Sequence, residues 1–214
     1  HKLMDIARFI DHSILKPEIT EKELEEQIAK CVELKVYAVC VHPYWVKRVV
    51  QLAGKELKVC AVISFPFGMD TKEQKIYQCL ESVEKGAEEL DIVMNFSALR
   101  SGQVDYVREE LLALARNTEG LVRKVIIETA YLSKEQKVLS VELIAESGME
   151  FVKTSTGFFA MGATVEDVRL LLDVSKGRLK VKASGGIKTK EQVVQFLSLG
   201  AQRIGTSNTF KILS

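Results

Sequence analysis

The chain has 214 residues, of which 47% are apolar and 28% are charged. Lys and Arg together number 30 and Asp and Glu number 29, so the formal net charge at pH 7 is +1. Disorder is excluded, because disordered chains combine low hydrophobicity with high net charge. The near-zero charge also argues against binding to nucleic acid or to an anionic membrane surface, since both partners attract a surplus of cations.

The sequence contains no feature that divides it or directs it to a membrane. It has no Gly/Ser linker and no low-complexity tract, so we expect one domain over residues 1–214. The apolar run 59–69 is too short to cross about 30 Å of hydrocarbon as a helix. We interpret His1 to Met4 as a cloning remnant rather than a targeting segment. The cysteines form no Cys-x-x-Cys pair and are expected to be buried, reduced thiols of a cytoplasmic protein.

A short apolar, β-branched run, a polar turn and a longer stretch of helical periodicity recur along the chain. Strands are predicted at Phe9–Ser13 (the weakest), Val36–Val41, Val59–Phe65, Leu90–Asn95, Lys124–Thr129, Phe151–Thr156, Lys180–Ser184 and Arg203–Thr206. Helices are predicted at Glu21–Leu34, Lys72–Lys85, Val104–Thr118, Lys134–Ser147, Val165–Ser175 and Lys190–Leu199.

This alternation predicts an α/β protein with a (β/α)8 TIM barrel. An open, doubly wound sheet is the alternative, because periodicity does not reveal closure. Three helix starts fit the capping-box spacing, and Gly86, Gly148 and Gly200 follow three helix ends. Few residues follow Thr206, so the last helix is expected to be short or missing.

In four consecutive predicted strands, from Leu90–Asn95 to Lys180–Ser184, the charged residues occupy alternate positions and so share one face of the strand. In a parallel barrel the helices cover the outer face, so polar side chains borne on strands point inward. The residues concerned are Asp91, Lys124, Glu128, Lys153 and Lys182. Burying so many charges is costly unless they pair or are used. A structural ion network is one interpretation; a catalytic cluster is favoured because Lys153 and Lys182 are followed directly by loop sequence, on the catalytic face of such barrels.

Two lysines on adjacent strands suggest amine chemistry. At about 6 Å and an effective dielectric of about 20 their repulsion is about 2.8 kcal/mol, or about two pKa units. Desolvation acts in the same direction, so we expect one of the two amines to be a neutral carbonyl nucleophile that forms a Schiff base. The spacing does not indicate which lysine attacks. Asp91 stabilises an ammonium and therefore fits a proton relay better.

Small residues follow the last two predicted strands. Ser184-Gly185-Gly186 leads to one helix and Gly205-Thr206-Ser207 to the short last one. Exposed backbone N–H groups at these positions hold a phosphate in many barrel enzymes. The two segments together favour a phosphorylated ligand over plain turns.

The segments that carry these residues resemble a known family. LDIVMN, KVIIET, FVKTSTGF, KVKASGGIKT and RIGTSN, preceded by IDHSILKP and YAVCVHPYWV, are similar to deoxyribose-phosphate aldolase from about residue 8 to 208. The resemblance implies a class I aldolase that interconverts 2-deoxy-D-ribose 5-phosphate with acetaldehyde and D-glyceraldehyde 3-phosphate. It further implies deoxyribonucleotide catabolism in the cytoplasm, a homodimer or homotetramer, and no metal or organic cofactor.

The resemblance also assigns roles. Lys153 of KTSTGF becomes the Schiff-base nucleophile, Lys182 of KASGGI the neighbouring amine, and Asp91 a proton donor and acceptor that works with Lys182 through an ordered water. Asp11 and Ser13 of IDHS contact the sugar or the relay, and Cys40 lines the pocket. The residues expected around the phosphate are Thr156, Gly157, Gly185, Gly186, Gly205, Thr206 and Ser207.

Some positions depart from the family pattern. Ser13 stands where many members have Thr, Asn208 replaces a small residue, and the sequence given ends at Ser214 without a longer final helix or tail. His12 is expected to be a hydrogen-bonded structural histidine, His42 a turn residue, and no grouping fits metal-ligand spacing. The alternatives are another Schiff-base barrel enzyme, acting on a different sugar or keto acid, and a phosphate-binding barrel without catalysis.

Overall fold

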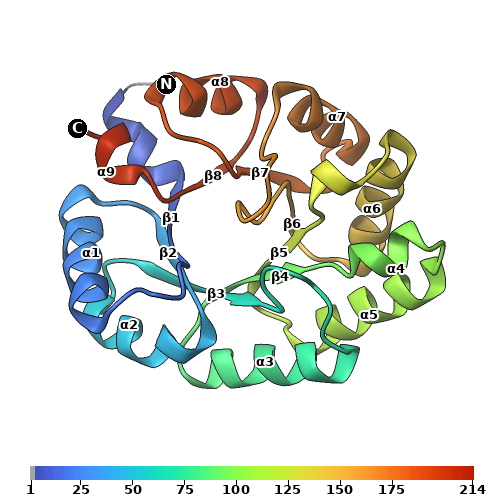
Figure 1. Ribbon diagram of the computed structural model, residues 1–214, viewed down its shortest axis with the longest axis horizontal. Helices are drawn as coiled ribbons and strands as arrows, with labels where there is room; N and C mark the ends of the chain where they lie inside the picture. The colour runs from blue at the N-terminus through green and yellow to red at the C-terminus, as the bar shows by residue number, and fades with distance from the viewer. Residues whose placement is uncertain (1–2) are drawn as a thin grey trace.

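In the computed structural model, which describes residues 3–214, eight parallel strands close into a barrel (Figure 1). The strands are β1 Ile10–Ile14, β2 Ala38–Val41, β3 Lys58–Ile63, β4 Glu89–Val93, β5 Val122–Ile126, β6 Phe151–Lys153, β7 Lys180–Ser184 and β8 Arg203–Thr206. Closure is made by β1 and β8, where Asp11 is in register with Gly205. The barrel prediction is confirmed. Of the segment interpreted as a cloning remnant, His1 and Lys2 lie outside the described residues.

Helices surround the barrel as an outer ring (Figure 1). They are α1 Glu21–Leu34, α2 Val46–Ala53, α3 Lys72–Glu84, α4 Phe96–Arg100, α5 Val104–Asn117, α6 Lys134–Ser147, α7 Val165–Ser175, α8 Lys190–Leu199 and α9 Thr209–Ile212. Short 3-10 helices lie at η1 Leu3–Phe9, η2 Pro43–Trp45 and η3 Thr129–Tyr131. The sequence did not predict α2 and α4, which are short and so show little periodicity; α9 is short, as expected. Within residues 3–214 no helix is both long and apolar enough to cross a membrane.

The helix starts follow their sequence signals. Thr20, Ser133 and Thr189 each accept a hydrogen bond from the backbone N–H three residues later, and that residue's side chain accepts one from the cap. A fourth capping box, Thr71 with Gln74, was not predicted. At the end of α6, Gly148 has φ 84°, a left-handed conformation that favours glycine.

The two faces of each strand lie in different surroundings. Apolar residues of one parity, such as Ile92, Val125 and Val181, pack under the helices in the main hydrophobic core. Residues of the other parity face the barrel axis, where a small apolar group around Cys40, Cys60 and Val62 lies beside charged side chains. The predicted inward direction is confirmed for the four charged residues that lie on strands: Asp91, Lys124, Lys153 and Lys182. Strand β5 ends at Ile126, earlier than predicted, so Glu128 lies beyond the strand.

One ion pair is buried in the helical layer rather than in the barrel. Lys75 on α3 lies 2.5 Å from Glu110 on α5 and also donates to the carbonyl oxygen of Val93 at 2.9 Å. Both side chains are buried; Lys75 donates to Oε1 of Glu110, and Oε2 has no hydrogen-bond partner among the described residues. The pair joins two neighbouring helices to the end of β4.

Removal of Lys75 is expected to be costly. Lys75→Ala leaves a buried carboxylate without its cation, which lowers the free energy of unfolding by about 3–5 kcal/mol. Lys58→Ala, which breaks a half-exposed pair with Glu88, is the matched control and is expected to cost less than about 1 kcal/mol. Urea denaturation of both variants measures the difference, and equal losses would show that burial of the α3–α5 pair is unimportant.

Candidate active site

Seven ionisable side chains form one connected network inside the barrel, here called the inner charge cluster. Its members are Asp11, Glu89, Asp91, Lys124, Lys153, Lys182 and Arg203. They come from β1, β4, β5, β6, β7 and β8, so the closed sheet brings together residues that are far apart in sequence. All seven are buried.

Asp91 lies at the centre of the cluster. Its Oδ2 accepts hydrogen bonds from Lys153 Nζ and Lys182 Nζ, each at 2.9 Å, and its Oδ1 accepts from Lys124 Nζ at 3.1 Å. Burial by itself would raise the pKa of Asp91, but the three ammonium groups hold that pKa well below its usual range. Asp91 is therefore a stable carboxylate that anchors three amines.

Lys182 is held as a cation. Its Nζ donates to Asp11 Oδ2 at 2.7 Å as well as to Asp91. Burial disfavours the ammonium, yet the carboxylates of Asp11 and Asp91 raise the pKa of Lys182 above the ordinary lysine value. The sequence left open which of the two amines is neutral, and these contacts favour the charged form of Lys182. Repulsion between the amines does not decide the charge of Lys182, because two carboxylates contact it directly.

The inner end of the cluster is closed by Arg203. Its Nη1 donates to Asp11 Oδ1 at 2.8 Å and to Glu89 Oε1 at 2.9 Å, and its guanidinium lies 4.2 Å from the ring centroid of Tyr37. Lys124 also contacts Glu89 at 2.5 Å. Three carboxylates thus meet four cations in the cluster.

A cavity of about 680 Å³ opens above the cluster, at the carboxyl ends of β1, β6, β7 and β8. Within residues 3–214, Lys153 is the cluster member that lines it. Lys182 and Asp91 are fully buried beneath this amine. The geometry therefore distinguishes two lysines that sequence spacing left equivalent.

The remaining predicted residues divide between the cavity and the layer below it. Ser13 and all seven residues expected around a phosphate line the cavity: Thr156, Gly157, Gly185, Gly186, Gly205, Thr206 and Ser207. Asp11 lies below, in the cluster. Cys40 is also below rather than in the described cavity lining; it is fully buried, with Sγ 3.6 Å from Lys182 Nζ. Cys40 is in register with Ser13 on the neighbouring strand, but its thiol contacts Lys182 and Asp91 in the inner charge cluster instead of lining the cavity.

The structure adds lining residues that the sequence interpretation missed. Lys16, Gln27, Lys188 and Asn208 contribute polar groups, and Phe158 and Phe159 contribute apolar ones. Lys16 and Lys188 could have been found from the sequence, because Lys16 directly follows the predicted site segment IDHSIL and Lys188 directly follows SGGI. Gln27 was not detectable, because it lies within α1 and reaches the site only through tertiary packing.

Two histidines have structural surroundings, as expected. His12 Nδ1 lies 2.7 Å from Thr209 Oγ1 and its Nε2 lies 2.7 Å from Gln27 Oε1. Burial lowers the pKa of His12, which favours the neutral ring. His42 precedes η2 and bonds the carbonyl oxygen of Leu15 at 2.8 Å.

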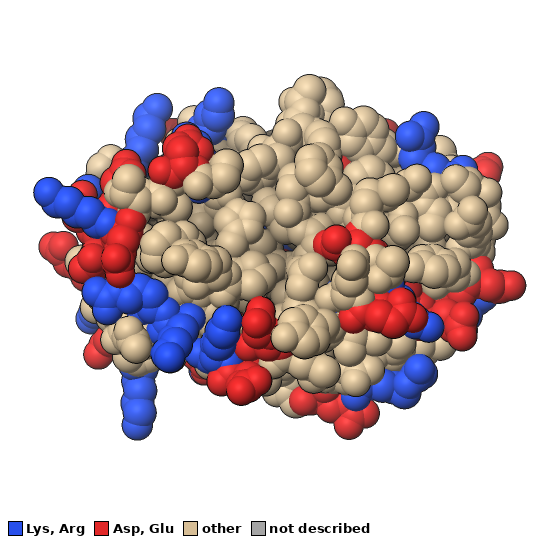
Figure 2. Space-filling model, turned by 60° about the horizontal axis from the view of Figure 1, so that its bottom comes forward, with Lys and Arg blue, Asp and Glu red and all other residues tan. Residues whose placement is uncertain are grey.

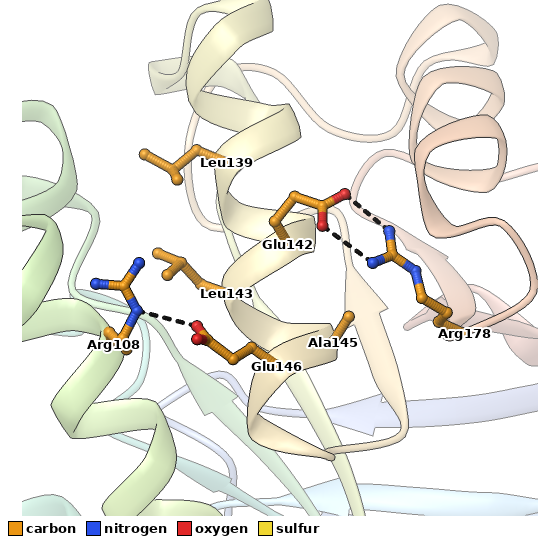
Figure 3. A pocket seen from close by; sticks show the side chains of 7 residues that line it. All are labelled: Arg108, Leu139, Glu142, Leu143, Ala145, Glu146 and Arg178. Carbon is orange, nitrogen blue, oxygen red and sulfur yellow. Dashed lines mark hydrogen bonds and ion pairs between the residues drawn. The ribbon is translucent and has the colours of Figure 1, made fainter.

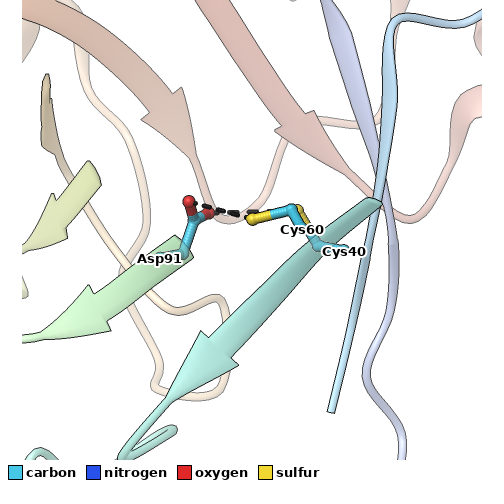
Figure 4. Close-up of side chains that lie close together, drawn as sticks. All are labelled: Cys40, Cys60 and Asp91. Carbon is cyan, nitrogen blue, oxygen red and sulfur yellow. Dashed lines mark hydrogen bonds between the residues drawn. The ribbon is translucent and has the colours of Figure 1, made fainter. Parts of the chain in front are cut away.

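Cys40, Cys60 and Asp91 are close enough to be considered as metal ligands, since their ligand atoms lie within 4.8 Å of one another (Figure 4). Cys60 Sγ donates to Asp91 Oδ1 at 3.2 Å. The same carboxylate already contacts three ammonium groups, which would repel a divalent cation. The donor set is therefore a poor fit to a metal.

A second hollow of about 440 Å³ lies on the outer surface over α6 (Figure 3). Its polar groups form ion pairs, Arg108 with Glu146 and Arg178 with Glu142. All four side chains are more than a third exposed, and such pairs contribute little. Nothing in this hollow offers a nucleophile, so the barrel cavity is the candidate active site.

Comparison with known proteins agrees with the geometry. A family described as DeoC/LacD family aldolase matches residues 6–207. The deoxyribose-phosphate aldolase of Aquifex aeolicus is 48% identical over 210 residues, covering 98% of this chain and 95% of its own. The chain belongs to the DeoC/LacD family of aldolases. The deoxyribose-phosphate aldolase of Thermococcus gammatolerans is 44% identical over 216 residues, with 98% and 96% covered.

Solved structures of family members have the same fold. The structure of QR15, described as an aldolase, has 47% identity and a TM-score of 0.95, covering 98% of this chain and 94% of that one. The deoxyribose phosphate aldolase from Aeropyrum pernix, described as tetrameric, has 31% identity and a TM-score of 0.92, with 99% and 90% covered.

The depressed pKa values of Asp91 and Asp11 make stability depend on pH. Both carboxyls have a lower pKa in the folded state than the unfolded value of about 3.9, so their contribution is complete at pH 7. It is lost as the pH falls from about 5 toward 2. Urea denaturation along this range is expected to show a falling free energy of unfolding. Asp91→Asn should reduce the slope of the free energy of unfolding against pH. Asp105→Asn, at a fully exposed carboxylate, should leave that slope unchanged. A wild-type free energy of unfolding that does not change with pH would contradict the account.

Gly205 has a spatial role beside Lys182. A Cβ at this position would lie 2.8 Å from Cε of Lys182 and 3.0 Å from Cβ of Ser184. Gly205→Ala is therefore expected to displace Lys182 and to lower kcat at least about tenfold. Gly120→Ala, where an added Cβ meets nothing within 4 Å, is the control. Wild-type kcat in Gly205→Ala would show that Lys182 has room to move without consequence.

Proposed function

We propose that this protein is a class I deoxyribose-phosphate aldolase, which cleaves 2-deoxy-D-ribose 5-phosphate reversibly to acetaldehyde and D-glyceraldehyde 3-phosphate. The observation that carries the proposal is the asymmetry of the lysine pair. Lys153 lines the cavity and forms an ion pair with Asp91, whereas Lys182 is fully buried and is enclosed by both Asp11 and Asp91. Family membership supports the same activity.

In the proposed reaction, Lys153 first releases its ammonium proton to water in the cavity. The neutral Nζ then attacks C1 of the open-chain sugar, and loss of water gives an imine. The imine accepts the electron pair of the C2–C3 bond as that bond breaks, while the C3 hydroxyl loses its proton and becomes the aldehyde of glyceraldehyde 3-phosphate. The enamine left on Lys153 is protonated at C2, and hydrolysis releases acetaldehyde. No metal or organic cofactor is required by these steps.

Lys182 and Asp91 would move the protons. Lys182 lies close to Lys153, since both donate to the same Asp91 oxygen at 2.9 Å. Asp91 has too low a pKa to be a strong acid or base itself, so we assign it the role of holding the two amines and an ordered water between them and the substrate. Positioning of this kind is what proton transfer demands of the site.

The phosphate of the substrate would lie against the small residues after β6, β7 and β8. Gly185, Gly186 and Ser207 offer backbone and hydroxyl groups on the cavity wall, and Lys16 and Lys188 add positive charge. Apart from Lys153, these two are the cationic side chains that line the cavity within residues 3–214. Their charge complements a phosphate dianion.

We further propose a homo-oligomer, dimer or tetramer, in the cytoplasm. The tetrameric description of the Aeropyrum pernix relative supports assembly. Several large apolar side chains are exposed, among them Phe67 and Met69 at 61% each. Figure 2 shows a face whose centre carries few charged residues, with Lys, Arg, Asp and Glu gathered toward its edges. A surface of this kind is suited to a contact between subunits.

Reductive trapping tests the function and the roles of the lysines. The protein is incubated with 2-deoxyribose 5-phosphate, treated with borohydride, digested and analysed by mass spectrometry. The expected adduct is on the Lys153 peptide and is absent in Lys153→Leu. An adduct on Lys182 would keep the reaction class and reverse the two roles. Binding of the sugar phosphate without any adduct would favour a barrel without catalysis, and turnover of other sugar phosphates or keto acids alone would indicate a different Schiff-base enzyme.

A further inference from the structure

Glu128 is a buried carboxyl group that the proposed mechanism does not use. It follows β5 directly and is fully buried. Its backbone has φ 56° and ψ 71°, a left-handed conformation that is uncommon for a residue other than glycine. It precedes η3 but gives that helix no side-chain cap. The side chain instead reaches across to the loop after β6.

The contacts of Glu128 fix the turn that follows the proposed nucleophile. Its Oε2 accepts hydrogen bonds from the backbone N–H of Thr156 at 3.2 Å and from the hydroxyl of Thr156 at 2.7 Å. The hydroxyl oxygen of Thr156 in turn accepts from the backbone N–H of Phe158 at 3.2 Å. One carboxylate oxygen therefore organises the segment 156–158, here called the Thr156 turn, which lies on the cavity wall.

The Thr156 turn packs against the loop that is expected to hold the phosphate. A Cβ built on Gly157 would lie 3.7 Å from Cα of Gly185, and one built on Gly185 would lie 3.1 Å from Cβ of Ser155. Two stretches of backbone therefore approach closely with little room between them. A displacement of the Thr156 turn would move the wall on which Gly185 rests.

The other oxygen of Glu128 has no partner. Oε1 is buried and makes no hydrogen bond. Burial raises the pKa of Glu128, against the opposing effects of its hydrogen bonds to Thr156 and of the Lys153 ammonium. Both observed bonds use an oxygen that a glutamine side chain also provides. The amide of Glu128→Gln thus keeps the two acceptor contacts and removes the charge.

We propose that Glu128 is a positioning residue for phosphate recognition: its Oε2 holds the Thr156 turn in the conformation that binds the phosphoryl group of the substrate. The proposal rests on the proposed function, because it requires a sugar phosphate as the ligand. It assigns Glu128 no contact with the reacting carbon. The carboxylate acts through Thr156, so its loss weakens binding of the phosphate end more than chemistry at Lys153.

Comparison of Glu128→Ala with Glu128→Gln separates the hydrogen bonds from the charge. Glu128→Ala is expected to raise KM for 2-deoxyribose 5-phosphate, and the inhibition constant of inorganic phosphate, by about thirtyfold, because buried donors lose their acceptor. Glu128→Gln should restore both constants to within about threefold of wild type. Glu135→Ala, at an exposed glutamate in the first turn of α6, is the control and should leave them unchanged.

Acetaldehyde separates phosphate recognition from catalysis, since it forms the imine but carries no phosphate. Borohydride trapping of acetaldehyde on Lys153 should be equal in wild type and Glu128→Ala. If the wild type itself forms no imine with acetaldehyde, the proposed function is wrong, and this is established before any variant is compared. If the wild type is active, equal losses of acetaldehyde trapping and of phosphate binding in Glu128→Ala would overturn the proposal. Phosphate binding as weak in Glu128→Gln as in Glu128→Ala would also overturn it.

Thr156→Val provides a second route in case Glu128→Ala does not fold. It removes the hydroxyl bond to Glu128 but leaves the backbone N–H bond, so it should raise the inhibition constant of inorganic phosphate, by less than Glu128→Ala does. The double variant should be no weaker than the weaker single variant, because both changes break the same chain of contacts. Additive effects in the double variant would show that Glu128 does not act through Thr156.

Discussion

The site depends on one carboxylate that is shared by three amines inside a closed barrel. Asp91 accepts from Lys124, Lys153 and Lys182, and no described side chain of the cluster is substantially exposed to solvent. Removing such a group from water is costly unless its partners remain charged and in place. The closed sheet meets this condition, because it fixes the strands that carry all four side chains. The barrel thereby holds two of the amines at a single oxygen atom.

The two lysines that donate to Asp91 Oδ2 differ in their charged neighbours and in their access to the cavity. Lys182 has a second carboxylate, Asp11, and no access to the cavity; Lys153 has Asp91 alone and lines the cavity. Arg203 and Lys124 meanwhile satisfy Glu89 and the remaining oxygens of the aspartates. In the proposed mechanism a nucleophile and a proton source thus arise from the same residue type, and the difference comes from their neighbours.

The sequence predicts the barrel and the direction of its charges, but not their electrostatic balance. Strand parity identifies Asp91 and Lys182 as inward residues, since alternation is a local property of the chain. The charge of Lys182 is not local, because its partner Asp11 lies 171 residues away and meets it only when the barrel closes. The place of Gln27 on the cavity wall and the contact of Cys40 with Lys182 likewise depend on tertiary packing, so the sequence does not reveal them. The short helices α2 and α4 escaped prediction for a different reason, having too few turns to show a period.

The central claim is that Lys182 remains an ammonium while Lys153 serves as the nucleophile. It is tested most directly by NMR of 15N-labelled lysine side chains, with the Lys182 signal assigned by its loss in Lys182→Arg. The account predicts that Lys182 keeps the ammonium shift through pH 10, near the value of about 10.4 at which exposed lysines titrate. Loss of the Lys182 proton below about pH 8 would contradict it, because Lys182 would then be the neutral amine.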